Sequence, residues 1–249
     1  MRVFGLIGYP LSHSFSRKYF LDKFKNENIN DAEYQNHSIS NIEQFSEILK
    51  LHNNFIGFNI TSPYKETIIP YLDELDVSAS EINAVNVVKI INESNRQKLI
   101  GYNTDIYGFK KSLQQKLNPE IKSALILGTG GAAKAVFFAL KSLNIECKFI
   151  SRSKSGNTYL SYKDLNNNII SDNLLLVNAT PSGIFPNTKA KPDIPYSYLT
   201  EKHHLFDLIY NPPLTQFLSE GKKKNATIQN GLEMLHFQAE KAWEIFNKS

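Results

Sequence analysis

The sequence predicts an α/β protein of two domains, and three observations predict it. Predicted strands and helices alternate through both halves of the chain, which is typical of sheets made mainly of parallel strands. The segment 124–127 is continuously apolar, as a strand covered on both faces should be. With 249 residues, the chain is long enough to build two domains with a core each.

The first half alternates strand and helix from its start. The apolar segment RVFGLIG predicts a strand, which ends in the turn YPLSHSFS. Ser40 or Asn41 is the expected cap of a later helix, because short polar side chains bond the first unpaired N–H groups of a helix. After the turn, the pattern predicts in order a helix over about 16–28, a strand over 33–40, a helix over 41–51 and a strand over 55–61.

The remainder of the first half is less regular. Segment 62–73 predicts a further helical stretch. Segments 84–92 and 98–103 predict two strands that are joined by a polar turn. Thr104 then opens a helix that runs to about Leu117, and the polar segment LNPEIKS separates the two halves.

The second half begins with a strand, a glycine turn and a helix. In SALILGTGGAAKAVFFALKS, the apolar strand is followed by Gly128, Gly130 and Gly131, and then by a helix without proline. A helix N-terminus carries unpaired N–H groups and a partial positive charge, and glycine lets a pyrophosphate approach the backbone. The segment therefore predicts a Rossmann-like dinucleotide site, although Ala133 stands where the G-x-G-x-x-G pattern has its third glycine. A plain connection between strand and helix is the alternative.

The end of the next strand, CKFIS, favours NADP over NAD. An NAD-binding unit usually places an acidic residue here to hold the ribose 2′-hydroxyl. This chain instead has Ser151, Arg152, Ser153 and Lys154, which suit a 2′-phosphate. A solvated basic turn is the alternative. Further strands are expected over 174–180, 204–210 and 226–230, with an amphipathic helix over 231–247.

Composition limits the classes of function. The net charge of +4 is too small and dispersed to indicate a nucleic-acid partner. Cys147 is the single cysteine, so an internal disulfide and a thiolate metal cage are excluded, and the spacing of the six histidines predicts no metal site. We find neither a signal-peptide pattern nor an apolar run of the roughly 20 residues that a membrane span needs. A soluble, cytoplasmic protein with no membrane partner is expected.

Polar side chains collect where the strands of the first half end. A doubly wound sheet binds its ligand at the carboxyl ends of its strands, and hydroxyls and amides suit a small polyhydroxylated acid. A lysine and an aspartate that face each other, here Lys65 and Asp105, would form a proton-transfer pair. Each of these residues also has a simpler explanation as a helix cap or a solvated side chain. The collected residues are Ser12, His13, Ser14, Ser16, Asn59, Thr61, Ser62, Lys65, Asn86, Asn103, Thr104 and Asp105.

Eight motifs, in order from Gly8 to the last helix, make the chain resemble the shikimate dehydrogenase family. They are GYPLSHSFS, GFNITSPYKE, INAVN, GYNTD, GTGGAAKA, NATPSG, DLIYNPPLTQFL and GLEMLHFQA. The chain departs from the family pattern at Arg17 in place of proline, at Tyr19 and Phe20 in the usual His-Asn region, at Ile106-Tyr107 and at Ser151 in place of asparagine.

The resemblance implies a fold, a reaction and a cofactor. It implies a substrate domain over 1–104 plus 231–249, a Rossmann-like NADP-binding domain over 105–230, and an active site in the cleft between them. The implied reaction is the NADPH-dependent, reversible reduction of 3-dehydroshikimate to shikimate, in the pathway to chorismate and the aromatic amino acids. A monomer or a homodimer is expected.

The resemblance also implies roles for single residues. Lys65 and Asp105 would be the catalytic pair, and Ser14 and Ser16 would bind the substrate carboxylate. The other expected substrate contacts are Asn59, Thr61, Asn86, Tyr210 and Gln238. The expected cofactor contacts are Gly128, Thr129, Gly130, Gly131, Ala132, Ser151, Arg152, Ser153, Thr180 and Gly231.

Two alternatives remain open from the sequence. The first is a quinate or dual quinate/shikimate dehydrogenase, since an additional ring hydroxyl changes few contacts. The cationic end of the second cofactor strand disfavours NAD, which quinate-active relatives use more often. The second is a non-catalytic dinucleotide-binding regulator, which would keep the glycine turn but would not need Lys65, Asp105 and the two serines.

Overall fold

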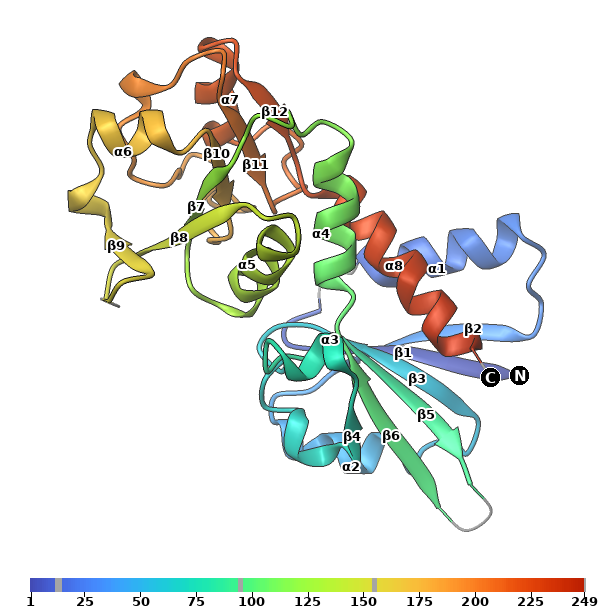
Figure 1. The fold of residues 1–249 in the computed structure, drawn as a ribbon. Coiled ribbons are helices and arrows are strands. Elements are labelled where there is room, and N and C mark those ends of the chain that lie inside the picture. The colour runs from blue at the N-terminus through green and yellow to red at the C-terminus, as the bar shows by residue number, and fades with distance from the viewer. Residues whose placement is uncertain (12–14, 94–95, 154–155, 249) are drawn as a thin grey trace. The chain divides into compact units, whose positions relative to one another are not determined.

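The computed structural model describes residues 1–11, 15–93, 96–153 and 156–248, and the chain forms two compact units (Figure 1). The first unit contains Met1–Thr104 and Ala239–Ser249, and the second contains Asp105–Gln238. Each unit is built on its own six-stranded sheet. The predicted α/β class with two domains is thereby confirmed.

The sheet of the first unit is mixed, with the strand order β2-β1-β3-β5-β6-β4. β1 runs parallel to β2 and β3, and β4 runs parallel to β6, whereas β5 is antiparallel to β3 and β6. The amino end of β5 therefore lies at the same edge as the carboxyl ends of β3 and β6. The strands are β1 (Arg2–Gly8), β2 (Ala32–Ser38), β3 (Phe55–Ile60), β4 (Glu74–Leu75), β5 (Val87–Asn92) and β6 (Gln97–Tyr102).

Helices cover both faces of this sheet. On one face, α1 (Phe15–Asn26) and the second half of α8 (Leu232–Asn247) pack against Phe4 and Leu6 of β1. On the other face, α2 (Phe45–Ile48) and α3 (Val77–Ser80) pack with Phe58 and neighbouring apolar side chains. β1 is consequently buried on both sides, which explains its continuously apolar sequence.

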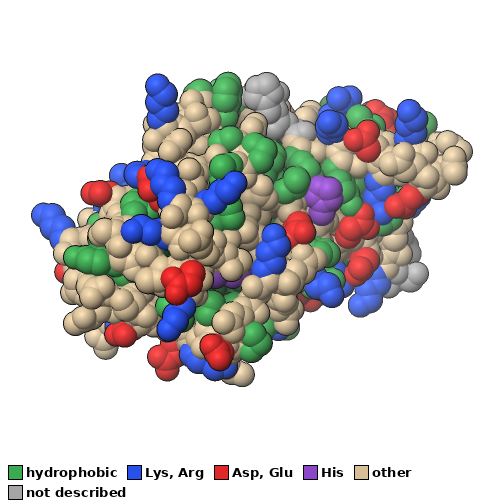
Figure 2. Space-filling view, turned by 90° about the horizontal axis from the view of Figure 1, so that it is seen from above, with side chains coloured by type: hydrophobic (Ala, Val, Ile, Leu, Met, Phe, Trp, Pro, Cys, Tyr) green, Lys and Arg blue, Asp and Glu red, His purple; other side chains and the backbone are tan. Residues whose placement is uncertain are grey.

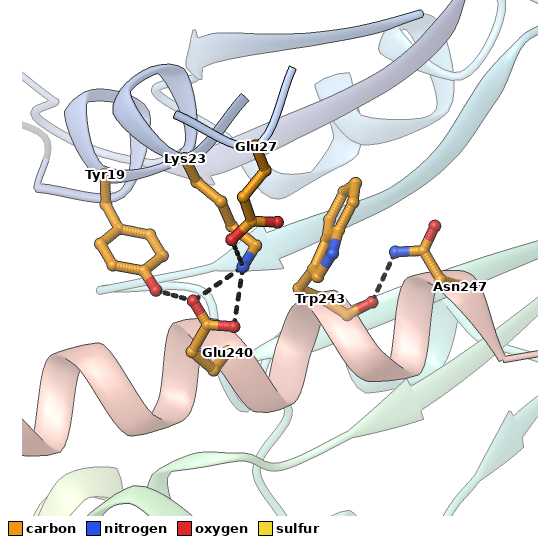
Figure 3. A network of polar contacts seen from close by, with 6 residues as sticks. All are labelled: Tyr19, Lys23, Glu27, Glu240, Trp243 and Asn247. Carbon is orange, nitrogen blue, oxygen red and sulfur yellow. Dashed lines mark hydrogen bonds and ion pairs between the residues drawn. The ribbon is translucent and has the colours of Figure 1, made fainter. Parts of the chain in front are cut away.

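A polar cluster joins α1 to α8 inside the first unit (Figure 3). The Lys23 ammonium lies 2.7 Å from Glu27 Oε1 and 2.9 Å from Glu240 Oε2, and the Tyr19 hydroxyl donates to Glu240. The Trp243 ring packs beside this cluster, with its centroid 5.2 Å from that of Phe4. These contacts hold the last helix of the chain against its first helix.

The predicted helical stretch over 62–73 is not an α-helix. The segment forms a run of turns and one short 3₁₀ turn, Ile69–Tyr71. Pro63 and Pro70 have no N–H to donate, so a regular helical ladder cannot run through the segment. The helix expected over 41–51 is also shorter, consisting of a 3₁₀ turn capped by Asn41 and the four residues of α2.

The sheet of the second unit is entirely parallel, with the order β12-β11-β10-β7-β8-β9. This is the order of a doubly wound dinucleotide-binding sheet, and the direction of winding changes between β7 and β10. The strands are β7 (Ser123–Leu127), β8 (Glu146–Ser151), β9 (Tyr159–Ser161), β10 (Leu175–Asn178), β11 (His204–Asp207) and β12 (Thr227–Gln229).

The strand β7 has helices on both of its faces, as its sequence predicts. Its residues Ala124 and Ile126 pack with α4 (Asp105–Gln114) and α5 (Gly131–Ser142). The alternate residues Leu125 and Leu127 pack on the opposite face, with α6 (Asn167–Asp172) and α7 (Gln216–Lys223).

The division of the chain differs from the expected one in residues 231–238. These residues group with the second unit, whereas the expectation placed everything from 231 onward in the first. Met234 accounts for the difference, because it packs with Phe109 and Leu113 of α4 in the core of the second unit. The helix α8 therefore begins in one unit and ends in the other.

Charged side chains of both signs are interspersed on the face seen in Figure 2. In the part of the chain that the structure describes, no helix is long and apolar enough to cross a membrane.

Two buried ionisable groups in β11 change the stability of the protein in opposite directions as the pH falls. Burial lowers the pKa of His204 to about 4, with a smaller contribution from Lys116, and Gln229 opposes this shift. Burial raises the pKa of Asp207 to about 6, although its hydrogen bonds oppose the rise. As the pH falls, the unfolded chain takes up a proton at His204 before the folded chain does, which lowers stability. The folded chain takes up a proton at Asp207 first, which raises stability.

Replacing His204 should therefore make the stability difference from wild type depend on pH. As the pH falls from about 7 to about 4.5, wild type should lose about 2 kcal/mol of unfolding free energy that His204→Gln keeps. The variant has no buried imidazole that must stay neutral. Urea unfolding at several pH values measures this difference. The exposed His52, changed to Gln, is the control. Parallel pH curves for His204→Gln and wild type would contradict the assignment.

Candidate active site

One edge of the first sheet carries three of the seven predicted substrate residues. Asn59 lies in β3 and Thr61 follows it, while Asn86 precedes β5 at the same edge. Thr61 donates its backbone N–H to Ile7 O at the end of β1. The strand order thus brings together Asn59 and Asn86, which are 27 positions apart in the sequence.

Backbone and amide hydrogen bonds hold this edge in place. The Asn86 side chain is 5% exposed; its Oδ1 accepts from Thr104 N at 2.7 Å and its Nδ2 donates to Thr104 Oγ1 at 3.1 Å. The preceding residue, Val85, donates its N–H to Lys65 O at 2.7 Å. Two adjacent residues therefore fix both the turn that carries Lys65 and the residue immediately before Asp105. Lys65 is half-buried and Asp105 is 3% exposed.

The structure describes only one of the two serines that are predicted to bind the substrate carboxylate. Ser14 lies outside the described residues, and Ser16 lies in the first turn of α1, half-buried. Asn59 Oδ1 accepts a hydrogen bond from the buried Tyr34 hydroxyl at 2.8 Å. Tyr34 lies outside every quoted motif and is not among the predicted site residues.

The glycine turn of the second unit has the shape that a pyrophosphate needs. Gly128 has φ +107°, a conformation that favours glycine, and a Cβ there would lie 3.1 Å from Ala179 O. A Cβ on Gly130 would meet no described atom within 4 Å, so the exposed backbone there is open to a ligand. Gly130 is also the N-cap of α5, whose first N–H groups follow at Gly131 and Ala132. The residues present are consistent with a dinucleotide, because this arrangement suits a phosphate.

The end of β8 presents one cation among the described residues of the predicted 2′-phosphate site. Arg152 and Ser153 are exposed, and Ser151 is buried with its Oγ accepting from Ser153 N at 3.2 Å. Lys154 lies outside the described residues. The Ser151 hydroxyl thus shapes the turn that carries Arg152.

A buried network at the carboxyl ends of β10 and β11 supports the cofactor edge. Asp207 Oδ1 accepts from Asn178 Nδ2 and from Ile209 N, each at 3.0 Å, and its Oδ2 accepts from Thr215 Oγ1 at 2.6 Å. Asn178 Oδ1 in turn accepts from the N–H and the hydroxyl of Thr180. Asp207 and Thr215 belong to the motif DLIYNPPLTQFL but are not among the predicted site residues. Asp207 lies next to Asn178 only because β10 and β11 are neighbouring strands, which the sequence does not reveal.

Three other predicted residues also lie in the second unit. Tyr210 follows β11, is half-buried, and has its pKa raised by burial. Gly231 lies so close to β11 that a Cβ would stand 2.1 Å from Leu208 O, so this glycine is required for packing. Gln238, half-buried in α8, lies against Gly108 of α4.

The described residues contain no group of three or more His, Cys, Asp or Glu side chains that could hold a metal ion. A depression of about 720 Å³ lies at the amino ends of β7 and β8, lined by Ser123, Lys141 and Glu146 among others. The glycine turn follows the carboxyl end of β7, so this depression is not part of the candidate site.

Comparison with known proteins identifies relatives along the whole chain. Residues 6–88 match the family model described as the shikimate dehydrogenase substrate binding domain. The shikimate dehydrogenase (NADP(+)) of a Methanococcus maripaludis strain is 40% identical over 98% of this chain and 91% of its own length.

Two solved structures have the same fold over 99% of this chain. A shikimate dehydrogenase crystallised with NADP+ has a TM-score of 0.86 at 33% identity, with 90% of its chain covered. The enzyme of Thermus thermophilus, in complex with NADP(H) and shikimate, has a TM-score of 0.86 at 29% identity, with 94% covered.

The Asp207 network makes Thr215 important for the stability of the second unit. Its hydroxyl donates to Asp207 and accepts from Leu218 N at 3.3 Å, as the cap of α7. Thr215→Val keeps the shape of the side chain but removes both bonds, so the free energy of unfolding should fall by about 1 to 3 kcal/mol. Urea unfolding measures the loss. Thr215→Ser keeps the hydroxyl and should lose less than half as much; equal losses would show that the hydroxyl is unimportant.

Proposed function

Because this chain belongs to the shikimate dehydrogenase family, we propose that it catalyses the reversible, NADPH-dependent reduction of 3-dehydroshikimate to shikimate. The observation that carries the proposal is the match to NADP(+)-named relatives over 98% of the chain, at up to 40% identity among those compared. The open glycine turn and the cation at the end of β8 support NADP as the cofactor. Most of the proposed substrate contacts belong to the first unit, and all of the proposed cofactor contacts belong to the second.

The bound nicotinamide supplies the hydride for the carbonyl carbon. The residues of the chain must then orient the ketone, give a proton to its oxygen and exclude water. We propose that Lys65 donates this proton and that Asp105 orients a ring hydroxyl and the lysine. The hydrogen bonds of Val85 and Asn86 support this role, because they fix the Lys65 turn and the residue before Asp105.

Neutral groups complete the proposed substrate site. Ser14 and Ser16 would donate hydrogen bonds to the carboxylate, and Thr61, Asn86 and Gln238 would contact ring hydroxyls. Two hydrogen bonds to Thr104 orient the Asn86 side chain, and Asn59 is a further proposed substrate contact. Tyr210 would lie near the substrate, and Thr180 and Gly231 near the cofactor.

The cofactor choice is tested by changing Arg152. The wild-type protein should reduce NADP+ with shikimate far better than NAD+ with shikimate or NADP+ with quinate. In Arg152→Ala, the NADP+ KM should rise by roughly 10- to 150-fold while the NAD+ KM changes little, because one charge-assisted bond to the 2′-phosphate is lost. Steady-state kinetics with both cofactors measure this split. Equal weakening of the two would contradict the 2′-phosphate contact, and higher activity on quinate would contradict the substrate.

The chemical role is tested at Lys65. Lys65→Ala should lower kcat by roughly 10²- to 10⁴-fold and change the shikimate KM much less, since a general acid acts in the transition state. Saturating NADP+ and a thermal melt separate this effect from cofactor binding and from misfolding. Lys222→Ala, on the exposed side of α7, is the matched control and should retain its kcat. A near-normal kcat with a raised KM would make Lys65 a binding residue.

A further inference from the structure

We propose that Tyr34 is a positioning residue of the substrate site, which holds the Asn59 amide in the orientation that binds substrate. The inference rests on the substrate contact assigned to Asn59 in the proposed function. Tyr34 lies in β2, outside every motif that the chain shares with the family, and none of the roles given above uses it.

The strand register places the Tyr34 phenol beside Asn59. Tyr34 pairs with Phe4 of β1, and Asn59 pairs with Leu6, two positions further along the same strand. Side chains two positions apart point to the same face of a sheet, so Tyr34 and Asn59 share a face. The phenol spans β1 along this face, and its hydroxyl donates to Asn59 Oδ1 at 2.8 Å.

Helix α1 holds the ring in place. Phe20 stacks on Tyr34 with a centroid distance of 4.6 Å and an interplanar angle of 12°, and both residues are 1% exposed. The phenol is therefore fixed by packing, with its hydroxyl bonded to Asn59.

The hydrogen bond from Tyr34 determines which atom of the Asn59 amide faces a ligand. Because Tyr34 donates to Asn59 Oδ1, the amide is held with its Nδ2, a donor, as the group left for a ligand hydroxyl. Without the hydroxyl, the Asn59 amide could turn over and present its oxygen, and the site would bind substrate less tightly.

The variant Tyr34→Phe removes the hydroxyl and keeps the stacked ring. We expect the shikimate KM to rise roughly 3- to 10-fold, as for one lost hydrogen bond. The kcat and the NADP+ KM should each stay within about twofold, because the reacting groups and the cofactor contacts are unchanged.

The control is Tyr196→Phe in the second unit. The Tyr196 hydroxyl donates to Pro192 O at 2.7 Å. Tyr196→Phe therefore also removes one phenol oxygen and one hydrogen bond, but at a residue that is not a predicted substrate contact. Thermal melts of both variants record the structural cost. A merely structural role of Tyr34 would lower the melting temperature in both variants and leave the shikimate KM of both unchanged.

The double variant Tyr34→Phe/Asn59→Ala tests whether Tyr34 changes the shikimate KM through Asn59. If Tyr34 acts through Asn59, adding Tyr34→Phe to Asn59→Ala should change the KM by less than about twofold, because contacting residues are not additive. An unchanged KM in Tyr34→Phe, or a full further effect in the double variant, would overturn the inference and leave the proposed function standing. An unchanged KM in Asn59→Ala would overturn the substrate role of Asn59 itself and the inference with it.

Discussion

The structure depends on how the chain pairs its backbone where parallel strands stop. Beyond the last ladder bond, N–H and C=O groups that stay buried need new partners, and here short polar side chains provide many of them. Asn86 does so for Thr104 in the first unit, and Asn178 and Asp207 do so for Thr180 and Ile209 in the second. The same residues thereby fix the loops in which the proposed ligand contacts lie. The hydrogen bonds that stabilise these strand ends therefore also set the geometry of the candidate site.

The elements with a strong repeating pattern could be predicted from the sequence. The strands β1, β3 and β7 and the helix α5 are long or continuously apolar, and the structure has them within a few residues of the predicted ranges. The short elements β4, α3, β9 and α6 were not predicted, because two to six residues carry too little periodicity. Segment 62–73 was wrongly predicted to be helical, because its prolines at 63 and 70 cannot donate to a regular helical ladder.

The candidate site could be predicted where residues adjacent in sequence act together, as in the glycine turn. It could not be predicted where contacts cross between strands. Asp207, Asn178 and Thr215 lie in separate segments, and only the order of β10 and β11 brings them together. Tyr34 carries no sequence signal at all, since a tyrosine in a strand is ordinarily a packing residue. The boundary at 231–238 likewise depends on the packing of Met234, which a helical pattern alone does not reveal.

The two rarest side chains of the protein fall in different units. The single tryptophan, Trp243, packs among Phe4 and Phe24 in the first unit, and the single cysteine, Cys147, lies half-buried in β8 of the second. Burial raises the pKa of this thiol to about 11, so it should react slowly with alkylating reagents while β8 is folded. Tryptophan fluorescence and thiol labelling would therefore each follow one unit of the unmodified protein, and together they would show whether the two units melt as one or separately.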